Sequence, residues 1–172
     1  MTSAYHKPVT SAGYLRFPHI HGDLIAFVAD DDVWLAPAAG GRAWRVTADH
    51  APASHPRISR DGTMIAWTGG RDGPPEVYLA GIDGGNGRRL SYWGDQGTRL
   101  CGWTPDSEVV AITSAGQPFR QHTTARALPV GNDGSLPRTL PFGLVTDVAV
   151  ETAGVALLTG TYREPAQWKR YC

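Results

Sequence analysis

Two histidines separated by a single residue, His19 and His21, are the first side chains in the sequence with the chemistry of metal ligands. They fall in a short strand-like segment, and because side chains alternate along a strand, both would point to the same face. A zinc site needs further ligands at a suitable spacing, and none follows here. We therefore expect His19 and His21 to be polar positions that line a channel or the rim of the fold.

Three consecutive acids, Asp30, Asp31 and Asp32, supply the carboxylate oxygens that calcium prefers. A calcium-binding EF-hand loop spaces its ligands, contains a glycine for a sharp turn and ends on a distal glutamate. The sequence around these acids lacks that pattern. It favours a solvent-exposed hairpin turn.

The glycine-rich segment from Gly81 to Gly87 is similar in composition to a phosphate-binding loop. It lacks the lysine and hydroxyl pair of such loops and opens no helix, so we interpret it as a hairpin turn. The sequence contains no Gly-x-Ser-x-Gly motif, and its serines, histidines and acids show no spacing typical of a catalytic triad. We predict no catalytic residue, no cofactor-binding residue and no metal ligand in this chain.

The tryptophans fall into two groups by their position. Trp34, Trp67 and Trp103 lie inside strand-like segments, and we interpret them as core residues between neighbouring sheets. Trp93 lies beside a loop, as does Arg99, and these two side chains are our candidates for contact with a bound peptide.

These residues are carried by a repeated β structure. An apolar pattern centred on alanine occurs four times, and its central residues, Ala26, Ala66, Ala111 and Ala156, are 40, 45 and 45 residues apart. A period of this length that contains only strand-like segments is typical of a β-propeller, with one four-stranded blade per repeat. In a blade the second strand is covered on both faces, so the alanines would be packing points between sheets.

Turn signals such as Asp61-Gly62 divide the repeats into strands. The sequence predicts an all-β partial β-propeller of about three and a half four-stranded antiparallel blades, with almost no helix. Its expected parts are a flexible N-terminal extension at residues 1–13, three blades at 14–48, 54–92 and 98–141, and a partial blade at 142–172. A β-sandwich is the alternative, but sandwich strands rarely repeat as four-strand units with matched turns.

The last strands of the first two repeats carry matching segments, Arg45-Val46-Thr47 and Arg89-Leu90-Ser91. We interpret their arginines as charges that keep an outer edge strand from pairing with other chains.

Composition narrows the classes of function. Of the 172 residues, 41% are hydrophobic, and 16 basic side chains balance 16 acidic ones, which argues against a general nucleic-acid or anionic-membrane surface. No apolar run approaches the length of about 18 residues that a membrane span needs, and the N-terminus has no signal-peptide core. The two cysteines, Cys101 and Cys172, form no disulfide framework. We expect a cytoplasmic location.

Several phrases between the repeats resemble the start of tricorn-type proteases. These phrases lie at 18–34 and 88–95, in Gln117-Pro-Phe-Arg120 and at 165–171, so the resemblance covers nearly everything after residue 13. It implies the N-terminal six-bladed propeller of a larger serine protease that degrades oligopeptides. The family's further propeller and protease domains, its hexameric assembly and its propeller channels for peptides follow from the same resemblance. Its catalytic groups lie in a C-terminal core that this sequence does not include.

Three functions follow from these observations. The first is a non-catalytic channel wall of a tricorn-like protease, with oligopeptides and the other domains as partners. Its inner strands, such as Tyr14–Ile20, Ser54–Ser59 and Arg99–Trp103, would line a pore that passes extended peptides and excludes folded protein. The second is a TolB-like or other interaction propeller without protease activity, and the third, an autonomous enzyme, is the weakest. Because the fourth repeat is incomplete, we expect two bare apolar sheet faces and therefore self-association of the isolated chain.

Overall fold

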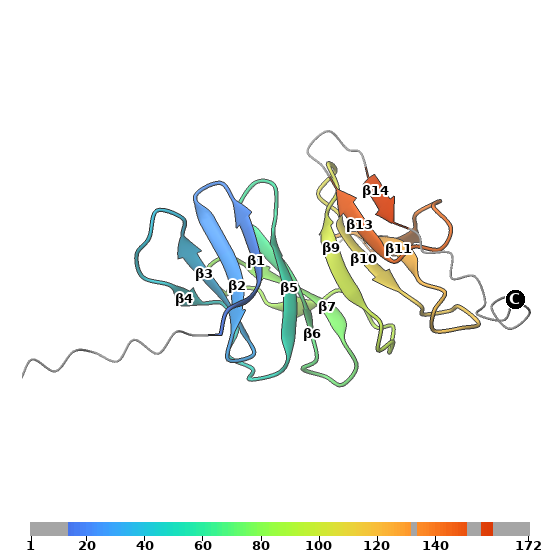
Figure 1. Ribbon diagram of the computed structural model, residues 1–172, viewed down its shortest axis with the longest axis horizontal. Helices are drawn as coiled ribbons and strands as arrows, with labels where there is room; N and C mark the ends of the chain where they lie inside the picture. Colours follow the sequence, from blue (N-terminus) through green and yellow to red (C-terminus); the bar gives the residue numbers. More distant parts are fainter. Residues whose placement is uncertain (1–13, 132–133, 151–155, 160–172) are drawn as a thin grey trace, which may run out of the picture.

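The computed structural model describes residues 14–131, 134–150 and 156–159, and these form strands and turns without a helix among them (Figure 1). The strands make three four-stranded antiparallel sheets and one two-stranded sheet, which follow one another in chain order. The prediction of an all-β partial propeller is confirmed. The expected flexible extension at residues 1–13 lies outside the described residues.

Each sheet is a meander in which every strand pairs with the one before it in the chain, and we call the sheets blades 1 to 4. Blade 1 consists of β1 (Arg16–His21), β2 (Leu24–Ala29), β3 (Asp32–Pro37) and β4 (Trp44–Arg45). Blade 2 consists of β5 (Ala53–Ile58), β6 (Met64–Gly69), β7 (Glu76–Gly81) and β8 (Arg88–Arg89). Blade 3 consists of β9 (Arg99–Trp103), β10 (Val109–Thr113), β11 (Thr124–Leu128) and β12 (Arg138–Thr139). The described part of blade 4 consists of β13 (Asp147–Val150) and β14 (Ala156–Thr159).

An apolar core fills each interface between successive blades. Between blades 1 and 2, small and branched side chains of β2 and β3 meet larger ones of β6 and β7: Ala26, Val28, Val33 and Leu35 on one side, Ile65, Trp67, Tyr78 and Ala80 on the other. The rings of Trp67 and Tyr78 stack with their centroids 5.8 Å apart. Each blade is therefore apolar on both faces, which explains the continuous apolar runs in the sequence.

The structure corrects the alignment of the third repeat. Ala26, Ala66 and Ala111 are all fully buried, as predicted. Ala26 and Ala66 face the following blade, whereas Ala111 packs on the preceding one, in the same core as Ala66. The counterpart of Ala66 in β10 is Val110, which belongs to the core between blades 3 and 4. A shift of one residue moves a side chain to the opposite face of a strand, so the repeated alanine marks burial but not orientation.

The tryptophans in the strands also divide. Trp67 and Trp103 lie in cores between blades, as predicted. Trp34 lies on the outer face of blade 1, where it pairs across strands with Phe27 and remains partly exposed. Its indole Nε1 donates to the Ala29 carbonyl at 3.2 Å. The interpretation of Trp34 as a core residue is therefore wrong for the described chain.

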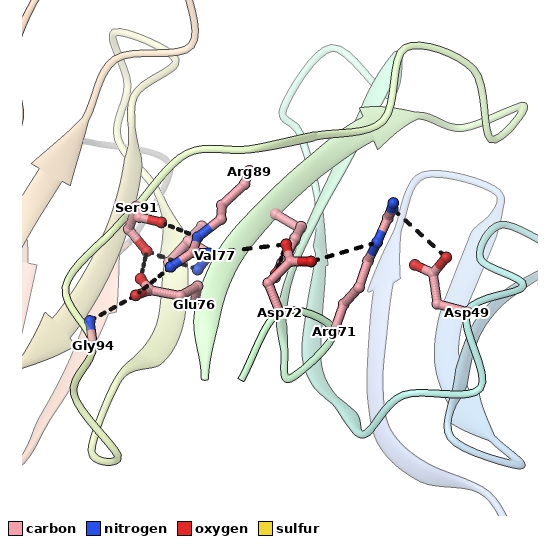
Figure 2. A network of polar contacts seen from close by, with 9 residues as sticks. Asp49, Arg71, Asp72, Glu76, Val77, Arg89, Ser91 and Gly94 are labelled. Atoms are coloured by element: carbon pink, nitrogen blue, oxygen red, sulfur yellow. Dashed lines mark hydrogen bonds and ion pairs between the residues drawn. The ribbon is translucent and has the colours of Figure 1, made fainter. Parts of the chain in front are cut away.

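A buried carboxylate organises the outer part of blade 2 (Figure 2). Glu76, at the start of β7, is fully buried and accepts hydrogen bonds from the Arg89 guanidinium at 2.9 Å and from the Ser91 hydroxyl. The backbone N–H of Gly94 donates to the same carboxylate at 2.7 Å. The Ser91 hydroxyl oxygen accepts in turn from the Val77 N–H at 2.9 Å. These contacts fasten the last strand and the segment that leaves the blade to the third strand.

Blade 1 repeats this arrangement with Asp32 as the buried acid. Arg45 pairs with Asp32 at 2.6 Å, and the Thr47 hydroxyl donates to it at 2.6 Å. In both blades the hydroxyl residue follows the acid by 15 positions. Arg45 and Arg89, predicted to protect an edge strand from pairing, also form ion pairs with the buried acids Asp32 and Glu76. The sequence analysis missed these pairs. In blade 3 the position of the acid is taken by Thr124, whose buried hydroxyl has no hydrogen-bond partner among the described residues.

The glycine-rich segment is a turn between β7 and β8, as predicted. Gly84 has a φ of 85°, and a Cβ at this position would lie 3.0 Å from the Val46 carbonyl oxygen. The Trp44 indole of blade 1 donates to the Ile82 carbonyl in the same turn at 2.8 Å. This turn is therefore a contact between blades 1 and 2.

Replacing Glu76 by alanine removes the buried carboxylate. The Arg89 guanidinium, the Ser91 hydroxyl and the Gly94 amide then lose their common acceptor. We expect the free energy of unfolding to fall by about 3–5 kcal/mol, the usual cost of breaking a buried pair. Urea denaturation of Glu76→Ala measures this loss. The control is Asp49→Ala, whose partly exposed carboxylate lies 3.6 Å from the exposed Arg71 guanidinium and should cost less than about 1 kcal/mol. Equal losses in the two variants would contradict the special role of Glu76.

The outer face of blade 1 presents Ile20, Ile25, Phe27, Trp34 and Ala36 in register, and Ile20 is 65% exposed. The equivalent face of blade 2 is buried against blade 1. We expect the 172-residue chain to self-associate through this face, because an exposed apolar sheet face is an association site. Sedimentation velocity over a concentration series measures it, with Ile20→Lys weakening association and the exposed Thr63→Lys leaving it unchanged. A chain that stays monomeric throughout would contradict this prediction.

Candidate functional site

The first strands of the four blades, β1, β5, β9 and β13, lie next to one another although they belong to four different sheets. They line a cavity of about 540 Å³. The polar side chains around it are His19, His21, Arg57, Arg60, Arg99 and Asp147. One side of the cavity is therefore a concave wall, which we call the inner wall, and each blade contributes its first strand to it.

Histidines of β1 tie blade 1 to blade 2. The Nδ1 atom of His19 accepts a hydrogen bond from the Ile58 N–H at 3.2 Å. The Nε2 atom of His21 lies 2.8 Å from the Arg60 carbonyl oxygen, to which it donates. Both histidines line the cavity, which agrees with the prediction that they are polar wall positions.

Two side chains tie blades 2 and 3 in opposite directions. The Arg57 Nε donates to the Cys101 carbonyl at 3.1 Å, and the Trp103 indole donates back to the Arg57 carbonyl at 3.0 Å. Because β5 and β9 share no backbone ladder, these side-chain bonds take its place along the inner edge.

Arg99 makes the corresponding tie between blades 3 and 4. Its guanidinium donates to the Thr146 carbonyl at 2.7 Å and pairs with the Asp147 carboxylate at 3.0 Å. This predicted residue therefore lies on the wall, in reach of whatever enters the cavity. Whether it contacts peptide remains a prediction.

Two histidines on the inner strands are poor bases. Burial, aided by the positive charge of Arg57, lowers the pKa of His19 to about 4. Burial also lowers the pKa of His55 to about 4, with contributions from Arg99 and Arg57. Protonation of His19 on Nδ1 would also remove the acceptor of the Ile58 N–H. Near neutral pH both rings are uncharged, and the charge of the wall comes from its arginines and Asp147.

Trp93 lies elsewhere. Its ring packs at the core between blades 2 and 3, and the Arg126 guanidinium lies over it, 5.3 Å from the ring centroid. Trp93 does not line the cavity, so the structure does not bring it together with Arg99. Its observed contacts are those of a packing residue.

The three consecutive acids do not converge on a common point. Asp31 pairs with Arg16 at 2.6 Å, whereas Asp32 is buried with Arg45. Asp30 and Asp31 have positive φ values of 48° and 63°, as expected in a tight turn. Within the described ranges, no group of three or more histidines, cysteines or acids is placed to hold a metal ion.

The inner strand Ser54–Ser59 was predicted to line the channel, and Arg57 on this strand does border the cavity, although it was not singled out as a site residue. Arg60 and Asp147 lie outside the inner strands that the sequence analysis named, and they were missed. The available signal was their position beside a first strand, because the first strands of successive blades should face a common axis. The buried thiol of Cys101 also borders the cavity, and burial raises its pKa, so it is protonated and unreactive.

A second cavity of about 380 Å³ lies between blades 1 and 2, beside the network of Figure 2. Its charged side chains pair with one another: Arg71 lies 3.6 Å from Asp49 and 3.9 Å from Asp72. The Tyr78 hydroxyl donates to Asp72 at 2.9 Å. These partners satisfy each other, so this cavity is a weaker candidate for a binding site than the inner wall.

The described residues include no helix that could cross a membrane.

The fold defines a class, that of β-propeller domains, of which the described residues form a part. The family described as the tricorn protease N-terminal β-propeller domain matches residues 12–172, and the chain belongs to this family. The chain is 54% identical to tricorn protease homolog 1 of Streptomyces coelicolor over 92% of its own length and 15% of that protein. It thus spans about a seventh of that relative.

Another relative is itself a short chain. A protein of Sulfurisphaera tokodaii, named as a tricorn-like protease N-terminal subunit, is 32% identical over 92% of this chain and 81% of its own length.

Solved structures agree on the fold. The crystal structure of the tricorn protease matches with a TM-score of 0.72 at 25% identity, over 85% of this chain and 15% of that one. TolB from Acinetobacter baumannii matches with a TM-score of 0.73 at 18% identity, over 89% of this chain and 39% of that one. The likeness to TolB concerns the propeller fold alone.

The lowered pKa values of His19 and His55 predict an acid-sensitive fold. Between the ordinary value of 6.5 and about 4, the unfolded chain binds protons at these positions and the folded chain does not. The free energy of unfolding therefore falls as the pH drops through this window and levels off below it, as far as these histidines are concerned. Because both rings are partly exposed, we expect less than the full slope of about 1.4 kcal/mol per pH unit for each.

Urea unfolding at several pH values between about 7 and 4 measures this slope. His19→Gln and His55→Gln should each reduce it, and His122→Gln, which alters a histidine away from the inner wall, should not. A slope that is the same in all three variants would assign the acid sensitivity to other groups.

Proposed function

We propose that this chain is the non-catalytic channel wall of a tricorn-like, oligopeptide-degrading serine protease. The observation that carries the proposal is the joint cavity of β1, β5, β9 and β13, where each blade contributes one strand to a single polar wall. An extended peptide offers backbone donors and acceptors to such a wall, while a folded protein is too wide to enter.

The similar proteins support this reading. The matching family is defined by its position at the N-terminus of the tricorn protease. Two curated tricorn protease homologs of Streptomyces coelicolor are about 15% covered by the chain, which leaves room for protease and further propeller domains outside the matched part. The described wall offers the protonated Cys101 thiol, the neutral His19 imidazole and the pair of Arg99 and Asp147 rather than an activated nucleophile. Proteolysis would therefore take place in other domains of the protein. This chain would contribute to a six-bladed propeller, and the whole protein would assemble as a hexamer in the cytoplasm.

The alternative is an interaction propeller without protease activity, similar to TolB. The TM-score of 0.73 favours it only at the level of the fold, since the identity is 18%. The two functions differ in where a partner binds: a scaffold uses an outer or end surface, whereas a channel uses the inner wall.

Photo-crosslinking tests the proposal directly. An unstructured decapeptide with a benzophenone side chain is irradiated with the chain, and the attachment sites are mapped by mass spectrometry. We expect attachment on β1, β5, β9 and β13, and competition by unlabelled peptide. A small folded protein with the same photoprobe should not label these strands.

Gly102→Leu sharpens the test. Gly102 lines the cavity, and among the described residues a Cβ there would meet Val150 alone, at an ordinary 3.8 Å, so we expect a larger side chain to extend into the cavity. We expect the crosslinking yield to fall about fivefold, equivalent to about 1 kcal/mol of binding. Gly87→Leu, in the exposed turn between β7 and β8, is the matched control and should retain the yield, with circular dichroism confirming the fold of both. Labelling confined to outer strands or loops would overturn the channel proposal in favour of the scaffold.

A further inference from the structure

The two ends of the propeller differ in their chemistry (Figure 1). Because each blade is a meander, the turns after its first and third strands lie at one end, and the turn after its second strand and the connection to the next blade lie at the other. We call the latter the connection end. Most of the large apolar side chains that are exposed among the described residues lie there: Tyr14, Leu15, Tyr92, Phe119, Phe142 and Leu144.

The opposite end is built from tight polar turns. Those between first and second strands contain Gly22-Asp23, Asp61-Gly62 and Pro105-Asp106. Within the described part of the chain, Leu136, between β11 and β12, is the one large apolar side chain exposed at this end, and Ile20 belongs to the outer face of blade 1. A polar end can stay in water, whereas exposed apolar side chains gathered at one end mark an interaction site.

Four of the exposed apolar side chains lie on the segments at the connection end of blade 3, and we call them the end patch. Tyr92 is 75% exposed in the connection between β8 and β9, and Phe119 is 57% exposed in the turn between β10 and β11. Phe142 and Leu144 lie in the connection between β12 and β13, and Leu144 is 53% exposed. These rings and the leucine side chain supply the kind of contact area that interface cores use.

Polar bonds hold the three segments of the end patch together. The Asp95 carboxylate accepts hydrogen bonds from the Ser114 N–H at 2.7 Å and the Ser114 hydroxyl at 2.9 Å, which fasten the first connection to the turn. The Val145 N–H donates to the Thr123 carbonyl at 3.0 Å, which fastens the second connection to the same turn. The end patch is therefore presented on a fixed backbone, so little conformational freedom is lost when a partner binds.

Arg120 places a positive charge beside the end patch. It follows Phe119 directly and is exposed, and no acid among the described residues pairs with it. An apolar centre with a polar rim is the usual composition of a protein–protein interface. The end patch therefore fits a protein surface that is apolar at its centre and acidic opposite Arg120.

A second copy of this chain is a poor match for that surface. The acids on the neighbouring described segments are engaged, because Asp95 accepts from Ser114 and Asp147 pairs with Arg99. The length of the relatives indicates a better occupant. The chain spans 15% of tricorn protease homolog 1, so most of that protein lies outside the matched region.

We propose that the end patch is the surface on which another domain of the tricorn-like protease docks, so that the connection end faces the rest of the protein and the opposite end faces solvent. This inference rests on the proposed function, since that function requires further domains. It adds a direction to the passage, which would continue from the connection end into the docked domain.

Hydroxyl-radical footprinting tests the inference, because the reactivity of a side chain follows its exposure. It compares the full 172-residue chain alone with a chimera in which the chain replaces the region of tricorn protease homolog 1 that it matches. We expect the reactivity of Tyr92, Phe119 and Phe142 to fall at least about fivefold in the chimera, because the centre of an interface is desolvated. Leu136, exposed at the opposite end, should keep its reactivity.

Variants of the chimera assign the protection to the end patch. Phe119→Lys combined with Leu144→Lys should return Tyr92 and Phe142 to their reactivity in the isolated chain, because a charge inside an apolar interface is costly. Leu136→Lys, the matched control, should leave them protected. The substituted side chains are exposed, so the fold should be kept, and thermal melting verifies it.

A second design applies if the chimera does not fold. Only segments 114–123 and 140–146 are then transplanted into the relative, which keeps the rest of its own propeller, and Phe119 and Phe142 are followed there. The same fall in reactivity is expected.

The outcomes separate this inference from the function on which it rests. Equal reactivity of the end patch in the chimera and the isolated chain would overturn the docking surface. Protection that already appears in the isolated chain and grows with its concentration would identify a second copy as the occupant and overturn it as well. The channel is read separately, from the photoreactive peptide on the chimera: if the inner wall is unlabelled, the proposed function fails, whatever the end patch shows.

Discussion

Among the described residues, the strands of successive blades share no backbone hydrogen bonds, so the interfaces between these blades are made by side chains. Within a blade the ladder between strands joins the chain regardless of sequence, but it ends at the edge of each sheet. Apolar faces supply most of the association between blades, and they carry little directional information. Direction between the blades comes from side-chain bonds at the inner strands, while a buried acid orders the outer strands within blades 1 and 2.

The inner contacts have a consequence for function. His19, Arg57 and Arg99 each reach the backbone of the next blade, so the residues that join the blades are also the residues that face the cavity. The bonds that join the blades use some of the hydrogen-bond donors and acceptors of these side chains, and the remaining ones face the cavity. His19 uses its Nδ1 acceptor and is held neutral, Arg99 pairs with Asp147, and Arg57 donates to the Cys101 and Pro56 carbonyls. The chemistry of the wall is therefore what remains after assembly.

The sequence predicts the blades well and the contacts between them poorly. Strands and turns follow from local patterns such as Asp61-Gly62, and most predicted strands agree with the structure to within a few residues. The two-residue strand β12 had no predicted counterpart, because so short a strand has no pattern of its own. The orientation of Ala111 and the partner of Glu76 depend on which face meets which blade, and that is a property of the assembled sheets. The wall position of Arg57 follows from the predicted inner strand Ser54–Ser59, but its bond to the Cys101 carbonyl depends on the neighbouring blade and could not be predicted.

Blade 3 shows how far such a repeat can diverge while the blades stay joined. Thr124 replaces the buried acid, and the aromatic pair of Trp67 and Tyr78 has its counterparts in Ala111 and Arg126. The connecting segment compensates: Trp93 packs into the vacated region beneath Arg126, and Asp95 accepts hydrogen bonds from Thr113 and Ser114.

Because each interface depends only on its two neighbours, one can change without disturbing the next. The inner ties reach backbone carbonyls and amides, which every sequence provides. The charge of the wall can therefore change from one protein to another with the fold unaltered.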